Sequence, residues 1–255
     1  ELYNLSFAEP LRGEAVQALK RYAALEDIEV EESRAGGAFA VQGPRARDLL
    51  GGWIEHGIWP EEPFREETVF GGGIRCFVRR SVETPAGGWQ LRRAIPPLWR
   101  ALVDEAQRLG GGAVGPAVAE VLRIEAGIPR WGVDLDGSNF PNECGWEEAL
   151  NYDKGCYIGQ EVIARMRTYG HLNKRLLRVR FGEAAEAPPG ARLYRDGKEV
   201  GQVTSSAASF LSGRVFALAY LRQPAWEPGT ILQVGAADGP AAGEVLPLGS
   251  PGSRS

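Results

Sequence analysis

One carboxylate in this sequence, Glu125, occupies a position where an apolar side chain is expected. A helix is predicted between Pro116, a residue favoured at the first helical position, and Gly127, a typical residue just past a helix end. Helical spacing places Glu125 on the apolar stripe of this helix, which is formed by Val118, Val121 and Leu122. A buried carboxylate requires a partner, because an unpaired buried charge is unfavourable. Two explanations stay open: an internal salt bridge to a distant arginine, or a ligand with paired N–H donors.

A second candidate for chemistry is Cys156, in the run Lys-Gly-Cys-Tyr-Ile-Gly-Gln-Glu that starts at Lys154. A helix is predicted over 160–169, so the thiol lies just before a helix N-terminus. The positive end of the helix dipole and the ammonium of Lys154 both favour the thiolate, which is the reactive form. The alternative is a small buried hydrophobic residue, which is also how we interpret Cys76 and Cys144.

The composition is that of an ordinary globular protein. Apolar residues make up 44% and charged residues 24% of the 255-residue chain, and the net charge of −4 argues against wholesale coating of nucleic acid. Three cysteines without a CxxC pair predict neither a disulfide framework nor a metal site, as in a reducing cytosol. No apolar run is long enough to span a membrane, and no secretory signal is recognisable. We therefore expect a cytoplasmic monomer without a membrane partner.

The first two thirds of the chain alternate between predicted helices and strands. Helices are expected over 11–24, 44–50 and 97–110, and strands over 27–32, 38–41, 73–79 and 88–93. This alternation predicts an α/β domain over residues 1–175, which carries both candidate residues.

The chain from residue 176 to residue 250 has the pattern of a small all-β module. Leu177, Val179 and Phe181 alternate with arginines, which is the period of a half-buried strand. The pair Asp196-Gly197 favours a type I′ hairpin turn. Further strands are expected over 213–221, 230–234 and 243–248. The predicted fold class is therefore α+β with a C-terminal β-barrel over 176–250, followed by a disordered tail over 251–255.

Two runs of this sequence resemble those of a known family. The run Leu-Arg-Ile-Glu-Ala-Gly-Ile-Pro-Arg-Trp-Gly, which starts at Leu122, is similar to the segment that identifies glycine-cleavage T-proteins, or aminomethyltransferases. The glutamate of that segment holds the pterin of tetrahydrofolate, and it falls here on Glu125. The eight residues from Lys154 resemble the signature of the YgfZ branch of the family. The resemblance implies that the folate-binding domain over residues 1–175 is built from ferredoxin-like units. It also implies tetrahydrofolate as cofactor, with Glu125, Lys154 and Tyr157 in binding roles and Cys156 as the candidate catalytic residue.

The same resemblance implies a folate-binding accessory protein that acts through Cys156 on iron–sulfur client proteins, in the assembly or repair of iron–sulfur enzymes, including tRNA-modifying ones. One alternative is a folate-dependent aminomethyl or one-carbon transferase, and another is a module that binds tRNA directly. The catalytic aspartate of T-proteins belongs to an N-terminal stretch that is not found ahead of Glu1. No catalytic base is therefore assigned, and whether the protein is an enzyme stays open.

Charges are distributed unevenly around these two runs. Residues 120–153 contain eight acidic and two basic side chains, whereas residues 154–180 contain seven basic and one acidic. The two stretches could neutralise each other across a shared surface. Alternatively, the basic stretch attracts the polyglutamate tail of folate, or RNA phosphate. Support for RNA is weak, since no aromatic-rich strand motif accompanies the basic stretch.

Overall fold

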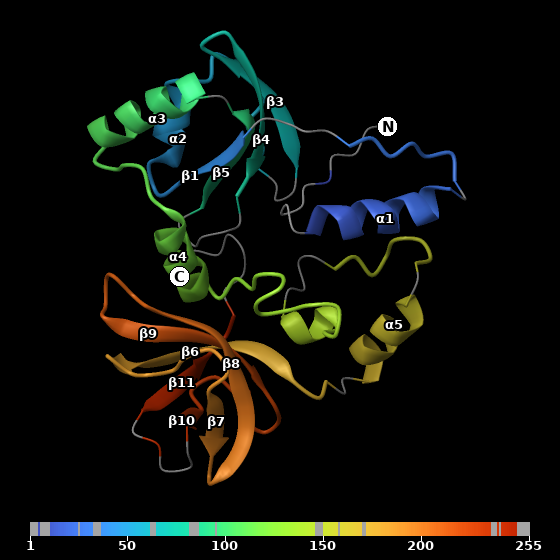
Figure 1. The fold of residues 1–255 in the computed structure, drawn as a ribbon, viewed down its shortest axis with the longest axis vertical. Coiled ribbons are helices and arrows are strands. Elements are labelled where there is room, and N and C mark those ends of the chain that lie inside the picture. The colour runs from blue at the N-terminus through green and yellow to red at the C-terminus, as the bar shows by residue number, and fades with distance from the viewer. Residues whose placement is uncertain are drawn as a thin grey trace. The chain divides into compact units, whose positions relative to one another are not determined.

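The computed structural model describes residue 5 and residues 11–24, 26–32, 37–61, 65–81, 87–94, 96–145, 150–157, 159–169, 172–235, 239 and 241–248. The tail predicted over 251–255 lies outside the described residues. The predicted fold class is confirmed, because helices and an open sheet precede a closed β-barrel in the chain (Figure 1).

Residues 1–37 form a unit of their own, built on helix α1 (Arg12–Ala23), which confirms the helix predicted there. Arg12 and Lys20 of this helix form ion pairs with Glu32, at N–O distances of 3.0 and 3.3 Å. The strand predicted over 27–32 is wrong, because residues 28–32 have no regular secondary structure. Ile28 is 62% exposed, so the alternating pattern has no sheet to pack against, and packing is what stabilises such a strand.

An open five-stranded sheet follows, in the order β1-β5-β4-β3-β2. Its strands are β1 (Gly37–Gln42), β2 (His56–Gly57), β3 (Glu66–Gly71), β4 (Ile74–Arg80) and β5 (Gly88–Ala94). The pairs β2–β3, β3–β4 and β4–β5 are antiparallel. The sequence does not predict strand β3. The strand begins with two glutamates, and a single buried apolar side chain, Val69, marks its inner face.

Two helices cover one face of this sheet and build its core. They are α2 (Ala46–Gly51) and α3 (Pro96–Arg108), close to the helices predicted over 44–50 and 97–110. Their leucines pack with alternate residues of the strands, a cluster that includes Leu49, Leu50, Leu98, Leu102, Val69, Cys76, Val78 and Leu91. The burial of Cys76 in this cluster agrees with its interpretation as a packing residue.

The second core lies inside a closed six-stranded barrel of order β10-β11-β6-β9-β8-β7, in which β10 pairs with β7. Its strands are β6 (Arg175–Glu183), β7 (Arg192–Arg195), β8 (Lys198–Ala208), β9 (Arg214–Leu221), β10 (Ile231–Val234) and β11 (Ala242–Leu246). Leu177, Val179 and Phe181 point into this core, as their alternation predicts. Asp196 and Gly197 have φ angles of +49° and +76°, so the predicted hairpin turn with two positive φ angles is confirmed.

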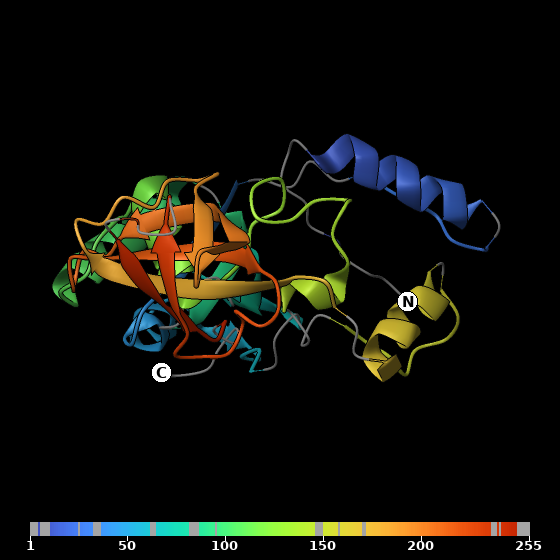
Figure 2. The same ribbon diagram turned by 90° about the horizontal axis from the view of Figure 1, so that it is seen from below.

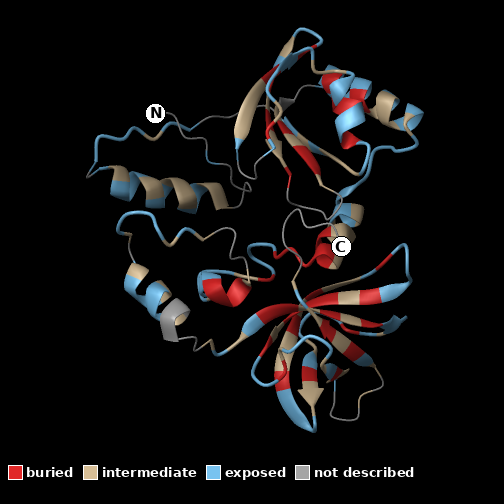
Figure 3. Ribbon diagram, turned by 180° about the vertical axis from the view of Figure 1, so that it is seen from behind, coloured by how far each residue is buried: buried red, intermediate tan, exposed pale blue. Residues whose placement is uncertain are grey.

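Three short helices connect the sheet to the barrel. They are α4 (Pro116–Ala126), the 3-10 helix η2 (Pro141–Cys144) and α5 (Gln160–Tyr169). Helix α4 packs against β8 and β9, and η2 packs against β6. Leu176 and Leu218, on the outer side of the barrel wall, are therefore as fully buried as the barrel interior. Figure 3 shows buried residues along the barrel strands and also in η2 and at the end of α4. This outer contact carries the α4 segment, and with it Glu125.

Candidate functional site

Helix α4 has the ends that the sequence predicts, with Pro116 in its first turn and Gly127 at a φ of 77° just past its end. The N–H groups of Gly127 and Ile128 donate to the carbonyl oxygens of Ile124 and Arg123, which closes the helix. The predicted apolar stripe is only half-buried, however. The buried positions of α4 are Arg123, Ile124 and Ala126, because a buried ion pair turns Arg123 inward.

Glu125 lies in the last turn of α4 and is half-buried. Its carboxylate makes no hydrogen bond or ion pair with any residue that the structure describes. Its main-chain oxygen, in contrast, accepts a hydrogen bond from Nη1 of Arg178, on barrel strand β6. The distant arginine that the sequence left open as a partner thus binds the backbone of Glu125, and the carboxylate oxygens stay available as acceptors.

A buried carboxylate, Asp134, ties the loop after α4 to both the helix and the barrel. Its side chain is fully buried, and its Oδ2 accepts from Nη1 of Arg123 at 2.6 Å and from the N–H of Arg130 at 2.9 Å. Its Oδ1 accepts from the hydroxyls of Thr204 and Ser205, both at 2.6 Å. Four donors thus satisfy one carboxylate, as a buried charge requires.

Arg123, the partner of Asp134, is equally well satisfied. Its Nε and Nη2 donate to Glu120 at 2.8 and 2.5 Å, and its Nη1 also donates to the carbonyl of Ile128 at 3.1 Å. The hydrogen bond from Arg123 is the main reason that the pKa of Glu120 is lowered. The end of α4 is therefore held in place by charges that are compensated within the protein.

The cysteine segment precedes α5 and is shaped by local hydrogen bonds. Oδ1 of Asn151 accepts the N–H groups of Asp153 and Lys154, both at 3.0 Å, which fixes the turn into the segment. The ammonium of Lys154 lies 4.8 Å from the centre of the Tyr157 ring, within the range of a cation–π contact. Cys156, between them in the chain, is exposed, whereas Cys76 and Cys144 are buried.

The structure brings some of the predicted site residues together and keeps others apart. Lys154 and Tyr157 are in contact, with Cys156 beside them in the chain. No hydrogen bond, ion pair or ring contact among the described residues joins this group to Glu125, and Figures 1 and 2 both draw α5 and the segment before it away from α4. Sequence reasoning missed Asp134 and Arg178 as residues that hold the end of α4 and the loop after it. Their partners lie up to 71 residues away in the chain, and no local pattern announces such a contact.

Among the described residues, two cationic side chains of the basic stretch bond to the acidic stretch. Nζ of Lys174 lies 3.8 Å from a carboxylate oxygen of Glu143, and Arg178 reaches the backbone of Glu125. Lys174 also lies over the ring of Tyr220, whose hydroxyl is 3.5 Å from the sulfur of Cys144. Burial is the main reason that the pKa of both Tyr220 and Cys144 is raised. Mutual neutralisation of the two stretches is therefore seen in part.

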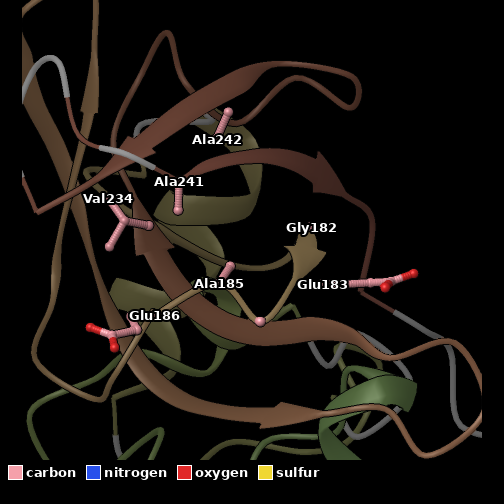
Figure 4. Close-up of a pocket in the computed structure, with 8 residues that line it drawn as sticks. Gly182, Glu183, Ala185, Glu186, Val234, Ala241 and Ala242 are labelled. Atoms are coloured by element: carbon pink, nitrogen blue, oxygen red, sulfur yellow. The ribbon is translucent and has the colours of Figure 1, made fainter.

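An open hollow of about 420 Å³ lies at one end of the barrel (Figure 4). It is lined by small side chains and two glutamates: Gly182, Glu183, Ala184, Ala185, Glu186, Val234, Ala241 and Ala242. The two carboxylates point away from each other in Figure 4, so they do not form the facing pair that general acid–base chemistry uses. None of the predicted site residues lines this hollow.

The described residues also bear on metal binding and on membrane insertion. No group of three or more His, Cys, Asp or Glu side chains among them could hold a metal ion. No helix in the described part of the chain is long and apolar enough to cross a membrane.

Comparison with known proteins places nearly the whole chain in two matched regions. Residues 3–154 match the GCVT N-terminal domain, and residues 174–248 match the glycine cleavage T-protein C-terminal barrel domain. Dimethylsulfoniopropionate demethylase from Ruegeria pomeroyi is 30% identical over 84% of this chain, and the aminomethyltransferase of Rubrobacter xylanophilus is 31% identical over 90%. The matched regions span 58% and 61% of those relatives' own lengths.

A solved structure shares the fold. The glycine cleavage system aminomethyltransferase T from Bartonella henselae superposes with a TM-score of 0.73 at 18% sequence identity. The superposition covers 92% of this chain and 64% of that one.

Proposed function

Because the chain belongs to the glycine cleavage T-protein family, we propose that it binds tetrahydrofolate and takes part in folate-dependent transfer of a one-carbon group. The names of the relatives support this reaction class, since one transfers an aminomethyl group and another removes a methyl group. No catalytic base is assigned to the chain, so the proposal concerns the ligand and the class of reaction.

The main support for this proposal is the burial and the hydrogen bonding of the Glu125 carboxylate. It is half-buried, and none of its oxygens is bonded to a described residue, while the buried Asp134 nearby accepts four donors. A half-buried carboxylate with free acceptors at a well-anchored helix end suits a ligand with adjacent N–H groups. A pterin carries such a pair in its amino group and its ring N–H, which two carboxylate oxygens can accept together.

Tetrahydrofolate titration of the parent protein and of Glu125→Gln tests this proposal, with tryptophan fluorescence as the readout. The amide keeps the size of the side chain but replaces one acceptor by a donor, so binding should weaken by about 1.5–3 kcal/mol, the range for a charge-assisted hydrogen bond. Glu227→Gln is the matched control, because Glu227 is an exposed glutamate in the connection between β9 and β10. Equal affinities for the parent and Glu125→Gln would assign Glu125 a structural role.

A second candidate function rests on Cys156, which is exposed beside the Lys154–Tyr157 contact. Here the protein is an accessory factor of the YgfZ type for iron–sulfur enzymes, and the thiol acts on the client.

Complementation in cells separates this second candidate from the first. Cys156→Ser should fail to support iron–sulfur enzyme activity while its tetrahydrofolate affinity stays that of the parent, because a hydroxyl replaces a thiol of similar size. Full support by the serine variant would leave the folate role standing and remove the role of the thiol.

A further inference from the structure

Arg178 extends from β6 toward α4, on the outer side of the barrel wall. It is half-buried there, next to the fully buried Leu176 and Leu218, which also face outward. Its Nη1 donates to the main-chain oxygen of Glu125, 53 residues earlier in the chain. Arg178, a cation, thus links the barrel to the last turn of α4 through the main chain of Glu125. Glu125 is also the candidate ligand-binding carboxylate.

The hydrogen bonding of Arg178 differs from that of its neighbours. Arg123 donates to two carboxylates, and Arg180, which lies on the same face of β6, donates to Glu244. Arg178 forms no ion pair with a described residue, and its Nε is buried without a hydrogen-bond partner among them. A buried guanidinium N–H without a partner is uncommon and calls for an explanation.

Glu125 is the acidic residue whose charge acts on Arg178. Burial has the largest effect and lowers the pKa of Arg178, and the neighbouring Arg180 lowers it further. The negative charge of Glu125 acts in the opposite direction and raises it. The two side chains are therefore close enough to attract each other although no direct bond joins guanidinium and carboxylate.

We propose that Arg178 is a positioning residue for Glu125: it holds the backbone of that residue and keeps a positive charge beside its carboxylate, so that the carboxylate is presented to the ligand. This inference rests on the proposed folate-binding role of Glu125. It gives the barrel a part in the site, because a strand of the barrel sets the place of a ligand-binding side chain on α4.

Tetrahydrofolate affinity should follow the charge and the donor at position 178. Arg178→Met removes both and keeps an apolar stem, and it should weaken binding about tenfold, which is within the range of coupling energies for contacting residues. Arg178→Lys keeps the charge and one donor, and it should restore most of that loss. Arg180→Met is the matched control, two residues away on the same face of the strand, and it should bind as the parent does.

The double variant separates positioning from direct contact with the ligand. If Arg178 acts through Glu125, then Glu125→Gln combined with Arg178→Met should bind no more weakly than Glu125→Gln alone. Losses that multiply in the double variant would overturn the proposal, as would parent-like affinity of Arg178→Met.

Hydrogen exchange without ligand keeps this test independent of the folate proposal. The amide hydrogens of the peptide that follows Glu125, through Arg130, should exchange faster in Arg178→Met than in the parent. In Arg180→Met they should exchange at the rate of the parent. If the parent binds no tetrahydrofolate, the proposed function fails while this exchange difference still supports the anchoring by Arg178. Unchanged exchange in Arg178→Met would overturn it whether or not folate binds.

Discussion

Asp134 and Glu125 lie within ten residues of each other in the chain, but they differ in burial and in hydrogen bonding. Asp134 is fully buried and accepts four hydrogen bonds, so its charge is compensated within the protein. Glu125 is half-buried, and none of the described residues donates to its carboxylate. The first has the surroundings of a structural ion and the second has those of a ligand-binding group. Residue type alone does not make this distinction, since both are acidic residues in the same acidic stretch.

The three cysteines should differ in reactivity for the same reason. Burial raises the pKa of Cys76 and is the main cause of the raised pKa of Cys144, so both thiols hold their protons near neutral pH and are also shielded from reagents. Cys156 is exposed. Alkylation with iodoacetamide at neutral pH, followed by mass spectrometry of peptides, should therefore label Cys156 first. Equal labelling of Cys76 in the folded protein would contradict the burial of that strand.

Helix α4 owes its position to the barrel more than to its own sequence. A register shift in β8 between Val203 and Ser205 places two consecutive hydroxyl residues, Thr204 and Ser205, on the same oxygen of Asp134. In a regular strand, consecutive side chains point to opposite faces, so this double contact depends on the irregularity. The loop after α4 is therefore anchored by a feature that lies 70 residues away in the chain.

Removal of Asp134 should be costly for stability. In Asp134→Ala the guanidinium of Arg123 loses a buried partner and two barrel hydroxyls lose their acceptor, so unfolding should become easier by about 3–5 kcal/mol. Urea denaturation measures this change. The matched control is Glu161→Gln, which breaks an exposed ion pair with Arg165 on α5 and should cost less than about 1 kcal/mol. A loss below 1 kcal/mol for Asp134→Ala would mean that water replaces the buried partner.

The molecule from residue 38 onward contains two separate apolar cores, one between the open sheet and its helices and one inside the barrel. They share no residue, and the segment with α4 and η2 lies between them in the chain. The polar network of Asp134 and the contact of Arg178 join that intervening segment to the barrel. The candidate site is thus placed outside both cores, where polar groups can be exposed to a ligand without disrupting either.

Core substitutions in the two parts should act independently. Leu91→Ala in the sheet and Leu232→Ala in the barrel each remove a fully buried side chain and should cost about 2–5 kcal/mol. Because the residues belong to different clusters, the losses in the double variant should add to within about 0.5 kcal/mol. Denaturation of the three variants measures this sum. A clear excess or deficit in the double variant would show that the two side chains are energetically coupled, contrary to their separation into two clusters.

Local signals sufficed for much of this protein. Pro116 and Gly127 act through their own backbone angles, and Asp196-Gly197 needs only two positive φ angles, so these helix and hairpin ends could be predicted from the sequence. Leu177, Val179 and Phe181 reveal the barrel strand by alternation alone. The run around Glu125 also identifies the family, because short motifs keep their residue types and spacing.

Only the tertiary structure decided what each charge binds. The alternating residues of 27–32 form no strand because no sheet receives them, whereas β3 forms despite two glutamates because its neighbours pair with it. In the sequence, Arg178 is one of several arginines predicted to face outward on a half-buried strand. No local pattern indicates that its partner is the backbone of Glu125. Hydrogen bonds and burial between distant segments arise when the chain folds, and they determine which carboxylate is satisfied and which stays available to a ligand.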